Sequence, residues 1–219
     1  MSSHVSAAPR GTAEVTSAIR EAIFSGVFVA GQRLVEADLC EQFNASRGAV
    51  RSALLELAGD GLVERIAHRG ARVRSVTLDE AIEIYEVRMV LEALCAAKAA
   101  ERIDASGELE LREIGERMSV AVDVGDVMGY RELNQRLHAL VRELSGQGTA
   151  SSVLERLRAQ SVRQQFQLAT MPGRPQVSLP EHLAIIDAIC ARDPEAADQA
   201  MRVHLSSVMD AMRELGRPS

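Results

Sequence analysis

The chain has few cysteines, a single lysine and no long hydrophobic segment. Its three cysteines, Cys40, Cys95 and Cys190, are far apart in the sequence, and no Cys-x-x-Cys pair occurs. An odd number of scattered cysteines argues against a disulfide framework and for a reducing compartment, with each thiol a small core residue. No apolar run approaches the roughly 20 residues of a membrane span, and residues 1–11 lack the apolar core of a signal peptide. We therefore expect a cytoplasmic protein without membrane contact.

Charge is distributed unevenly along the 219 residues. The formal net charge is −6, but residues 1–75 hold nine arginines and eight acidic residues, which gives +1. The remainder holds 16 basic and 23 acidic residues, which gives −7. Lys98 is the only lysine, and the basic residues of the first part concentrate between Arg47 and Arg74. The first part is therefore the one suited to a polyanion, with modest non-specific affinity because it neutralises few phosphates.

Residues 33–74 have the pattern of a winged helix-turn-helix. A first short helix is predicted from the spacing of Leu34, Val35, Leu39 and Phe43, and it leads into a turn at Asn44-Ala45. Ser46 stands where the N-cap of the next helix is needed. That helix has its core positions at Val50, Ala53, Leu54 and Leu57 and is ended by Gly59 and Gly61. Two alternating runs, Leu62–Ile66 and Ala71–Val76, flank His68-Arg69-Gly70 and predict a hairpin wing.

The outer face of the second helix carries Arg47, Gly48, Arg51 and Ser52. Two arginines one turn apart, with small residues between them, suit a helix that enters a major groove about 12 Å wide. The alternative is a solvated helix face, since arginine is frequent throughout the chain. The serine cap before this face and the basic wing after it favour DNA contact. Arg65, Arg72 and Arg74 on the wing are either solvated or in contact with phosphate.

This segment resembles the DNA-binding domain of the GntR family of bacterial transcription regulators. The resemblance covers about residues 10–76 and includes the upstream helix Thr12–Ser25 and Gly31-Gln-Arg-Leu34. It implies that Arg47 and Arg51, with Ser46 and Gly48 beside them, contact a palindromic operator in double-stranded DNA. It also implies that the wing tip, Arg69 and Gly70, reaches the minor groove. Several family members have a basic residue early in the first motif helix, where this chain has Glu36-Ala37-Asp38, so no DNA contact is assigned there.

Residues 77–219 predict a second, all-helical domain, after a disordered tail at 1–10 and a DNA-binding domain at 11–76. Capping boxes at Thr77–Glu80 and Ser178–Glu181 mark two helix starts, Asp193-Pro194 marks a third, and Met171–Pro175 reads as a loop. The expected helices are 77–102, 106–123, 126–146, 149–170, 178–192 and 194–215. Six antiparallel helices form a bundle, and bundles build ligand and metal sites from side chains in their interior.

Three of the five histidines, His138, His182 and His204, lie in this domain. Asn134 precedes His138 by one helical turn, so both project from the same face. Three imidazoles and one oxygen form a ligand set for zinc, or for nickel or manganese, with positions left for water or a small acid. From the residues alone, three unrelated core or surface histidines are the more common arrangement.

The second domain resembles the FCD ligand-binding domain of the FadR subfamily, in its shorter, VanR-like version with six helices. The resemblance rests on Tyr85–Glu92, on Asn134–His138 leading to Ser145-Gly-Gln147, and on Glu181-His182 with Asp193–Ala197 and His204 downstream. In metal-binding members an aspartate and three histidines hold the ion, and His138, His182 and His204 match the three histidines. Asn134 stands in place of the aspartate, which removes one negative charge from beside the ion.

Arg88 is the predicted effector-binding residue. It lies among apolar residues of the long helix, and its guanidinium group suits a carboxylate. A salt bridge to Glu92, four residues later, explains the spacing equally well, and the family pattern favours the ligand. Arg163, with Gln164 and Gln167, is a weaker candidate of the same kind.

Two functions compete. The first is a homodimeric transcription regulator, a repressor, that responds to a small organic acid bound beside a divalent ion. The second is a metal-dependent, hydrolase-like enzyme with a DNA-binding appendage, in which Glu181 beside His182 would be the general base. The sequence contains no nucleophile motif, phosphate loop or cofactor fingerprint. We therefore predict a regulator and not an enzyme.

Overall fold

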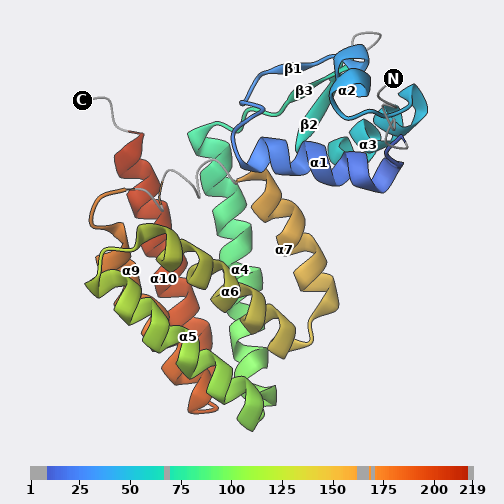
Figure 1. Ribbon diagram of the computed structural model, residues 1–219. Coiled ribbons are helices and arrows are strands. Elements are labelled where there is room, and N and C mark those ends of the chain that lie inside the picture. The colour runs from blue at the N-terminus through green and yellow to red at the C-terminus, as the bar shows by residue number, and fades with distance from the viewer. Residues whose placement is uncertain (1–8, 67–69, 162–167, 169–170, 217–219) are drawn as a thin grey trace, which may run out of the picture. The chain divides into compact units, whose positions relative to one another are not determined.

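The computed structural model describes residues 9–66, 70–161, 168 and 171–216 (Figure 1). The chain separates into two units, Met1–Val76 and Thr77–Ser219, which are described one at a time. The predicted fold class is confirmed: a winged helix-turn-helix is followed by an all-helical bundle. Among the described residues, no helix combines the length and the apolar character needed to cross a membrane.

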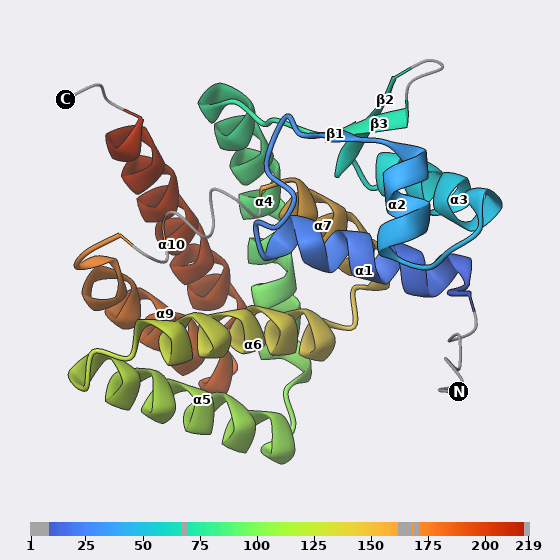
Figure 2. The same ribbon diagram turned by 45° about the horizontal axis from the view of Figure 1, so that its top comes forward.

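The first unit packs three helices against a small sheet (Figure 2). The helices are α1 (Thr12–Phe24), α2 (Glu36–Gln42) and α3 (Arg47–Gly59). The strands β1 (Arg33–Leu34), β2 (Val63–Ile66) and β3 (Gly70–Val73) form an antiparallel sheet in the order β1-β3-β2. Apolar side chains of α1 and α3 meet in the core, where Val15, Ile19, Val50 and Leu57 are fully buried. Helix α3 is thereby fixed with its polar face outward.

The turn before α3 confirms the predicted helix start. Asn44 has a φ of 47°, a left-handed conformation that asparagine tolerates better than most residues. Oγ of Ser46 accepts a hydrogen bond of 3.1 Å from the backbone N–H of Ala49. A backbone donor at the start of α3 is satisfied in this way.

The start of the first motif helix differs from the prediction. Leu34 lies in β1, where it pairs with Ala71, and Val35 is the N-cap of α2. Leu34 is buried as part of the sheet and not on a helix face. Its apolar spacing with Leu39 therefore predicted the wrong element. The wing strand β3 also ends at Val73, three residues earlier than expected. His68 and Arg69 lie outside the described residues.

Gly70 is required by the backbone of this sheet. Its φ is +88°, and a Cβ at this position would lie 2.5 Å from the carbonyl oxygen of Leu34. A side chain here would therefore both strain residue 70 and push β1 away from β3.

We predict that Gly70→Ala destabilises the first unit by roughly 1–3 kcal/mol, the cost of a strained backbone conformation. Gly48→Ala is the matched control, because a Cβ at Gly48 would meet only Oγ of Ser46 at 3.9 Å. That control should be neutral or slightly stabilising, since alanine favours helix over glycine. Chemical denaturation of both variants tests this, and equal stabilities would contradict it.

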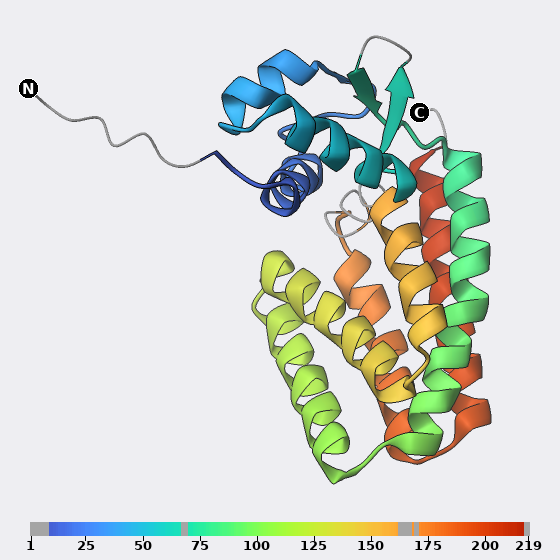
Figure 3. The ribbon, with the colours of Figure 1, turned by 90° about the vertical axis from the view of Figure 1, so that its right-hand side faces the viewer.

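The second unit is a bundle built around two long helices, α4 (Leu78–Arg102) and α10 (Pro194–Leu215). These two helices pack along each other, as Figure 3 shows. Helices α6 (Val127–Ser145), α7 (Gly148–Gln160) and α9 (Arg174–Cys190) also contact α4, and α5 (Ala105–Asp123) covers α6 and α9. Thr77 and Asp193 cap α4 and α10 as predicted, accepting from the N–H groups of Glu80 and Ala196.

Two predicted boundaries in the bundle are wrong. Helix α9 begins at Arg174, after Gly173 with a φ of 78°, so Ser178 is a buried residue inside the helix and caps nothing. Pro175 occupies the first turn, where a proline costs no hydrogen bond, and Pro180 lies inside the helix. Helix α7 ends at Gln160 and not at residue 170, and Oγ of Ser161 bonds back to the carbonyl of Leu157.

The cysteines are free thiols. Cys95 and Cys190 are buried in the bundle, as expected, whereas Cys40 is only half-buried.

Candidate functional site

The exposed face of α3 carries Arg47, Gly48 and Arg51. Beside it lies a hollow to which β1, α2, α3 and both wing strands contribute, and its polar lining includes Arg33, Glu36, Arg47, Arg51 and Arg65. Four guanidinium groups around one hollow form a surface suited to phosphate and base edges. The prediction did not include Arg33, because its place in β1 was not foreseen. Arg72 pairs instead with Glu64 at 2.9 Å.

Glu36 reaches into this basic surface. Its Oε2 accepts a hydrogen bond of 2.8 Å from Nε of Arg51, whose side chain remains 68% exposed. An exposed ion pair of this kind adds little to stability. A carboxylate at this position would, however, repel the phosphates of DNA and compete for Arg51.

We predict that Glu36→Gln raises DNA affinity several-fold. Arg51→Ala should weaken the binding free energy by about 1–3 kcal/mol, the value of an arginine contact to a base. Fluorescence anisotropy across a salt series measures both. Glu41→Gln is the control, because Glu41 is an exposed residue of the same helix that does not line the hollow. An equal gain from both glutamine variants would show that net charge alone, and not the Glu36–Arg51 pair, sets the affinity.

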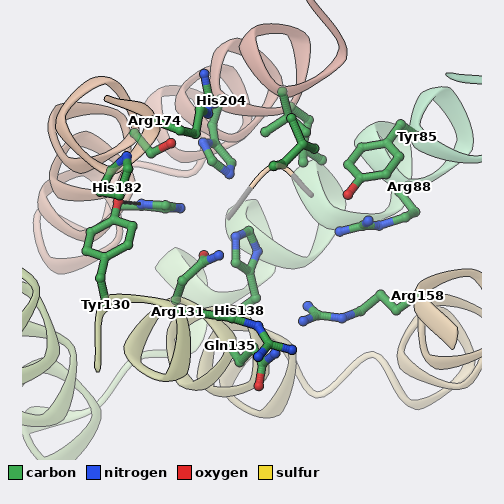
Figure 4. A pocket seen from close by; sticks show the side chains of 16 residues that line it. Tyr85, Arg88, Tyr130, Arg131, Gln135, His138, Arg158, Arg174, His182 and His204 are labelled. Atoms are coloured by element: carbon green, nitrogen blue, oxygen red, sulfur yellow. Dashed lines mark hydrogen bonds between the residues drawn. The ribbon is translucent and has the colours of Figure 1, made fainter. Parts of the chain in front are cut away.

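Three histidines converge in the bundle, from three different helices. His138 comes from α6, His182 from α9 and His204 from α10, and all three are buried. One nitrogen from each ring lies within 4.8 Å of the others, and the ring centroids of His182 and His204 are 4.3 Å apart. Figure 4 shows the three rings around one pocket. The structure thus brings together residues that are 66 positions apart in sequence.

Each histidine has a partner on its Nδ1 side. Nδ1 of His182 is 2.9 Å from the hydroxyl of Tyr130, and Nδ1 of His204 is 2.8 Å from Oε2 of Glu181. Nδ1 of His138 is 2.7 Å from Oε2 of Glu92, although the angle falls short of a hydrogen bond. Partners of this kind fix the tautomer of metal-binding histidines and leave Nε2 with its lone pair. Nε2 of His182 is buried and has no protein partner.

Burial keeps two of these rings, those of His138 and His182, neutral. It lowers the pKa of His138 to about 4, against the opposing attraction of Glu92. Burial, with His204 and His138 nearby, also holds the pKa of His182 well below its ordinary value. Burial alone would raise the pKa of Glu92, but Arg88 and His138 hold it well below the usual range. At neutral pH both rings can therefore donate a lone pair, beside an ionised carboxylate.

Asn134, the predicted oxygen ligand, lines the same pocket. Its Oδ1 is buried without a hydrogen-bond partner, which is costly unless another group binds there. The cavity volume is about 90 Å³. Because one water needs roughly 10–15 Å³ on this measure, the pocket has room for an ion together with a small molecule. The donor set and the orphaned atoms fit a divalent cation.

Arg88 forms the salt bridge that its spacing allowed, and its geometry leaves the ligand role open as a prediction. Its Nε and Nη2 donate to Oε1 of Glu92 at 2.9 and 2.7 Å, so the salt bridge exists. Its Nη1, however, is buried without a partner, and Arg88 lines the pocket. The guanidinium group stacks on the ring of Tyr85 at 4.2 Å. One nitrogen therefore remains for a ligand.

Several pocket residues were not predicted. Arg158 from α7 and Arg174 from α9 line the cavity, and Glu92, Tyr130 and Glu181 hold the histidines. Arg158 follows Leu154, a fully buried residue of α7, by four positions. Residues four apart lie on one face of a helix, so this spacing places Arg158 on the inward face of α7 and could have identified it. Arg163, the predicted candidate, lies outside the described residues.

The fold and the two sites define a class of protein: a regulator that binds DNA through a winged helix and a small molecule through a helical bundle. Residues 12–73 match the gntR family of bacterial regulatory proteins, and residues 83–207 match the FCD domain. The chain therefore belongs to the GntR family of bacterial transcriptional regulators, with an FCD domain as its second unit.

The relatives agree with this assignment. The transcriptional repressor RspR of Escherichia coli is 26% identical over 197 residues, which cover 90% of this chain and 86% of RspR. A probable D-xylose utilization operon repressor of Paenarthrobacter nicotinovorans is 27% identical, covering 86% and 83% of the two chains. A putative GntR regulator from Rhodococcus sp. RHA1 has a solved structure with a TM-score of 0.71 at 26% identity, covering 94% and 99%. E. coli McbR/YncC has a TM-score of 0.78 at 20% identity, covering 94% and 98%, which shows the shared fold.

These relatives are transcription regulators, so the interpretation as a regulator and not an enzyme is confirmed. Glu181, which the sequence suggested as a general base, contacts His204 and also lies 3.4 Å from Arg174.

Proposed function

We propose that this chain is a cytoplasmic, homodimeric repressor that binds a palindromic operator and responds to a small carboxylate held beside a divalent ion. The observation that supports the metal most strongly is the set of three buried histidines whose Nδ1 atoms each face a separate partner. A divalent ion in this place supplies an electrostatic anchor for an anion. The DNA contacts are assigned to Arg47, Arg51, Ser46 and Gly48 on α3, with Arg69 and Gly70 on the wing.

His138, His182 and His204 would hold the ion, with the amide oxygen of Asn134 as the fourth protein ligand. Ligands of a tetrahedral zinc lie roughly 3.3 Å apart, whereas the three ring nitrogens spread over as much as 4.8 Å. The rings must therefore close in slightly. Asn134 brings no charge, so the protein ligands leave both charges of the ion to be offset by an anion.

We predict that the protein binds one zinc ion per chain and that His182→Ala loses it. Asn134→Asp should bind zinc at least about tenfold more tightly, because one added charge contact is worth more than about 1.4 kcal/mol in a buried site. Elemental analysis of tag-free protein gives the stoichiometry, and competition with a chelating dye gives the affinity.

Asn44→Asp is the matched control for the aspartate variant, because it makes the same substitution in the first unit. It should leave zinc affinity unchanged. Wild-type protein that stays free of metal in excess zinc would rule out the metal centre.

The carboxylate would use the unpartnered Nη1 of Arg88. Arg88 and Glu92 lie on α4, and Glu92 also contacts a histidine of the site. Helix α4 begins at Leu78, directly after the residues of the first unit, so the chain has almost no linker there. A ligand that shifts α4 would thereby couple effector affinity and operator affinity.

We predict that Arg88→Lys removes the effect of the carboxylate on operator binding while effector-free DNA binding stays normal. Lysine keeps the charge opposite Glu92 but lacks the second nitrogen of the fork. Alanine is a poor test here, because it would leave the buried Glu92 carboxylate without a counter-charge.

The measurement is operator binding by anisotropy, with and without the carboxylate that gives the largest thermal shift in a screen. Arg112→Lys, in an exposed pair with Glu108 four residues away, is the control. A normal response of Arg88→Lys would place the carboxylate away from α4.

A further inference from the structure

The outer face of α4 carries a row of exposed apolar side chains. Val87, Val90 and Leu94 are 50%, 52% and 39% exposed. Their spacing of three and four residues places them on one face of the helix, away from the buried Arg88 and Glu92. Figure 3 shows α4 on the outside of the bundle. Neighbouring large apolar side chains that stay exposed mark an interaction surface.

The other long helix, α10, has no comparable row. Its exposed large apolar residues are Val203 and Leu215, which lie 12 positions apart. The exposed positions between them include Ser206, Asp210 and Arg213, all of them polar. Isolated exposed apolar residues are normal on a protein surface. The apolar row of α4 is therefore a feature of that helix and not of the long helices in general.

Charges of opposite sign flank the apolar row of α4. Glu83 lies four residues before Val87 and is exposed. Lys98, the single lysine of the chain, lies four residues after Leu94. Both charges therefore lie on the face of the row. Lys98 forms a partly exposed pair with Glu101 at 2.7 Å, and such a pair is weak enough to yield to another partner.

This face is complementary to itself when two copies of α4 run in opposite directions. The midpoint between positions 87 and 94 lies between residues 90 and 91, and so does the midpoint between positions 83 and 98. A two-fold axis through this point places Val87 of one copy opposite Leu94 of the other, and Glu83 opposite Lys98, with each contact made twice. A parallel pair would place Glu83 opposite Glu83 and Lys98 opposite Lys98, which is repulsive.

We propose that two copies of this chain associate through antiparallel pairing of their α4 helices. Val87, Val90 and Leu94 form the apolar centre, and ion pairs between Glu83 and Lys98 lie at both ends. Flanking charges of this kind set the orientation of paired helices, and here they select a second copy as the partner. The inference rests on the homodimer of the proposed function, to which it adds the surface and the direction of the helices.

The first test is the dimer dissociation constant of the full-length protein, measured by analytical ultracentrifugation. Val90→Lys places a charge in the centre of the apolar row and should weaken the dimer at least about tenfold. Val203→Lys is the matched control, because Val203 is a valine of α10 with 50% exposure. It should leave the constant unchanged. Both side chains are exposed, so neither variant disturbs the core, and melting curves check this.

The second test exchanges the flanking charges. Glu83→Lys and Lys98→Glu should each weaken the dimer several-fold at low salt, because each places like charges opposite one another at both ends of the interface. The double variant restores opposite charges and should associate nearly as tightly as the wild type. This rescue is specific to the antiparallel arrangement, because in a parallel pair the exchange leaves like charges opposite one another.

The outcomes separate this inference from the proposed function. A dimer that Val90→Lys leaves intact, or a double variant no tighter than the single ones, would overturn the α4 interface and leave the homodimer standing. A wild-type chain that is monomeric both alone and on operator DNA would overturn the homodimer of the proposed function, and this inference with it. The apolar row would then serve a different partner.

Discussion

The bundle depends on one buried carboxylate, Glu92. It is 2% exposed, and its two oxygens face different partners: Oε1 accepts two hydrogen bonds from Arg88, and Oε2 lies against His138. Arg88 is thereby held with one nitrogen free, and His138 is held with its lone pair free. Removing this carboxylate would leave a buried guanidinium group without its counter-charge, which is strongly destabilising. The proposed effector site and the proposed metal site are therefore connected through Glu92 on α4.

The same arrangement shows an advantage of arginine, the basic residue that this chain uses almost exclusively. A guanidinium group keeps its charge when it is buried and offers several donors in fixed directions, so it can satisfy a protein carboxylate and a ligand at once. In the bundle, Arg88 donates to Glu92 with two nitrogens and keeps Nη1 without a protein partner. On the first unit, Arg51 is held by Glu36 while most of its side chain stays exposed. In both units the acidic partner positions an arginine without consuming all of its donors.

Local signals in the sequence predicted much of the fold. Ser46, Thr77 and Asp193 are capping residues whose side chains act on backbone groups three residues away, so their effect does not depend on the rest of the chain. Predictions that needed tertiary context were less successful. The apolar spacing around Leu34 predicts a helix because its partner in the sheet, Ala71, lies 37 residues later, beyond the reach of any local pattern. Ser178 has the sequence pattern of a cap but is buried inside α9. The histidine set came from family resemblance, whereas Arg158 and the Nδ1 partners required the packing of separate helices.

Pro180 gives α9 a weak turn at the place where it carries two site residues. A proline inside a helix has no N–H to donate to the carbonyl four residues earlier, so the backbone there lacks one hydrogen bond and bends more easily. Glu181 and His182 follow directly. Helices α6 and α10 carry their histidines on turns without such an interruption. An ion bound as proposed would therefore draw the three ring nitrogens together most easily by bending α9, with α9 as the adjustable side of the site and α6 and α10 as its fixed frame.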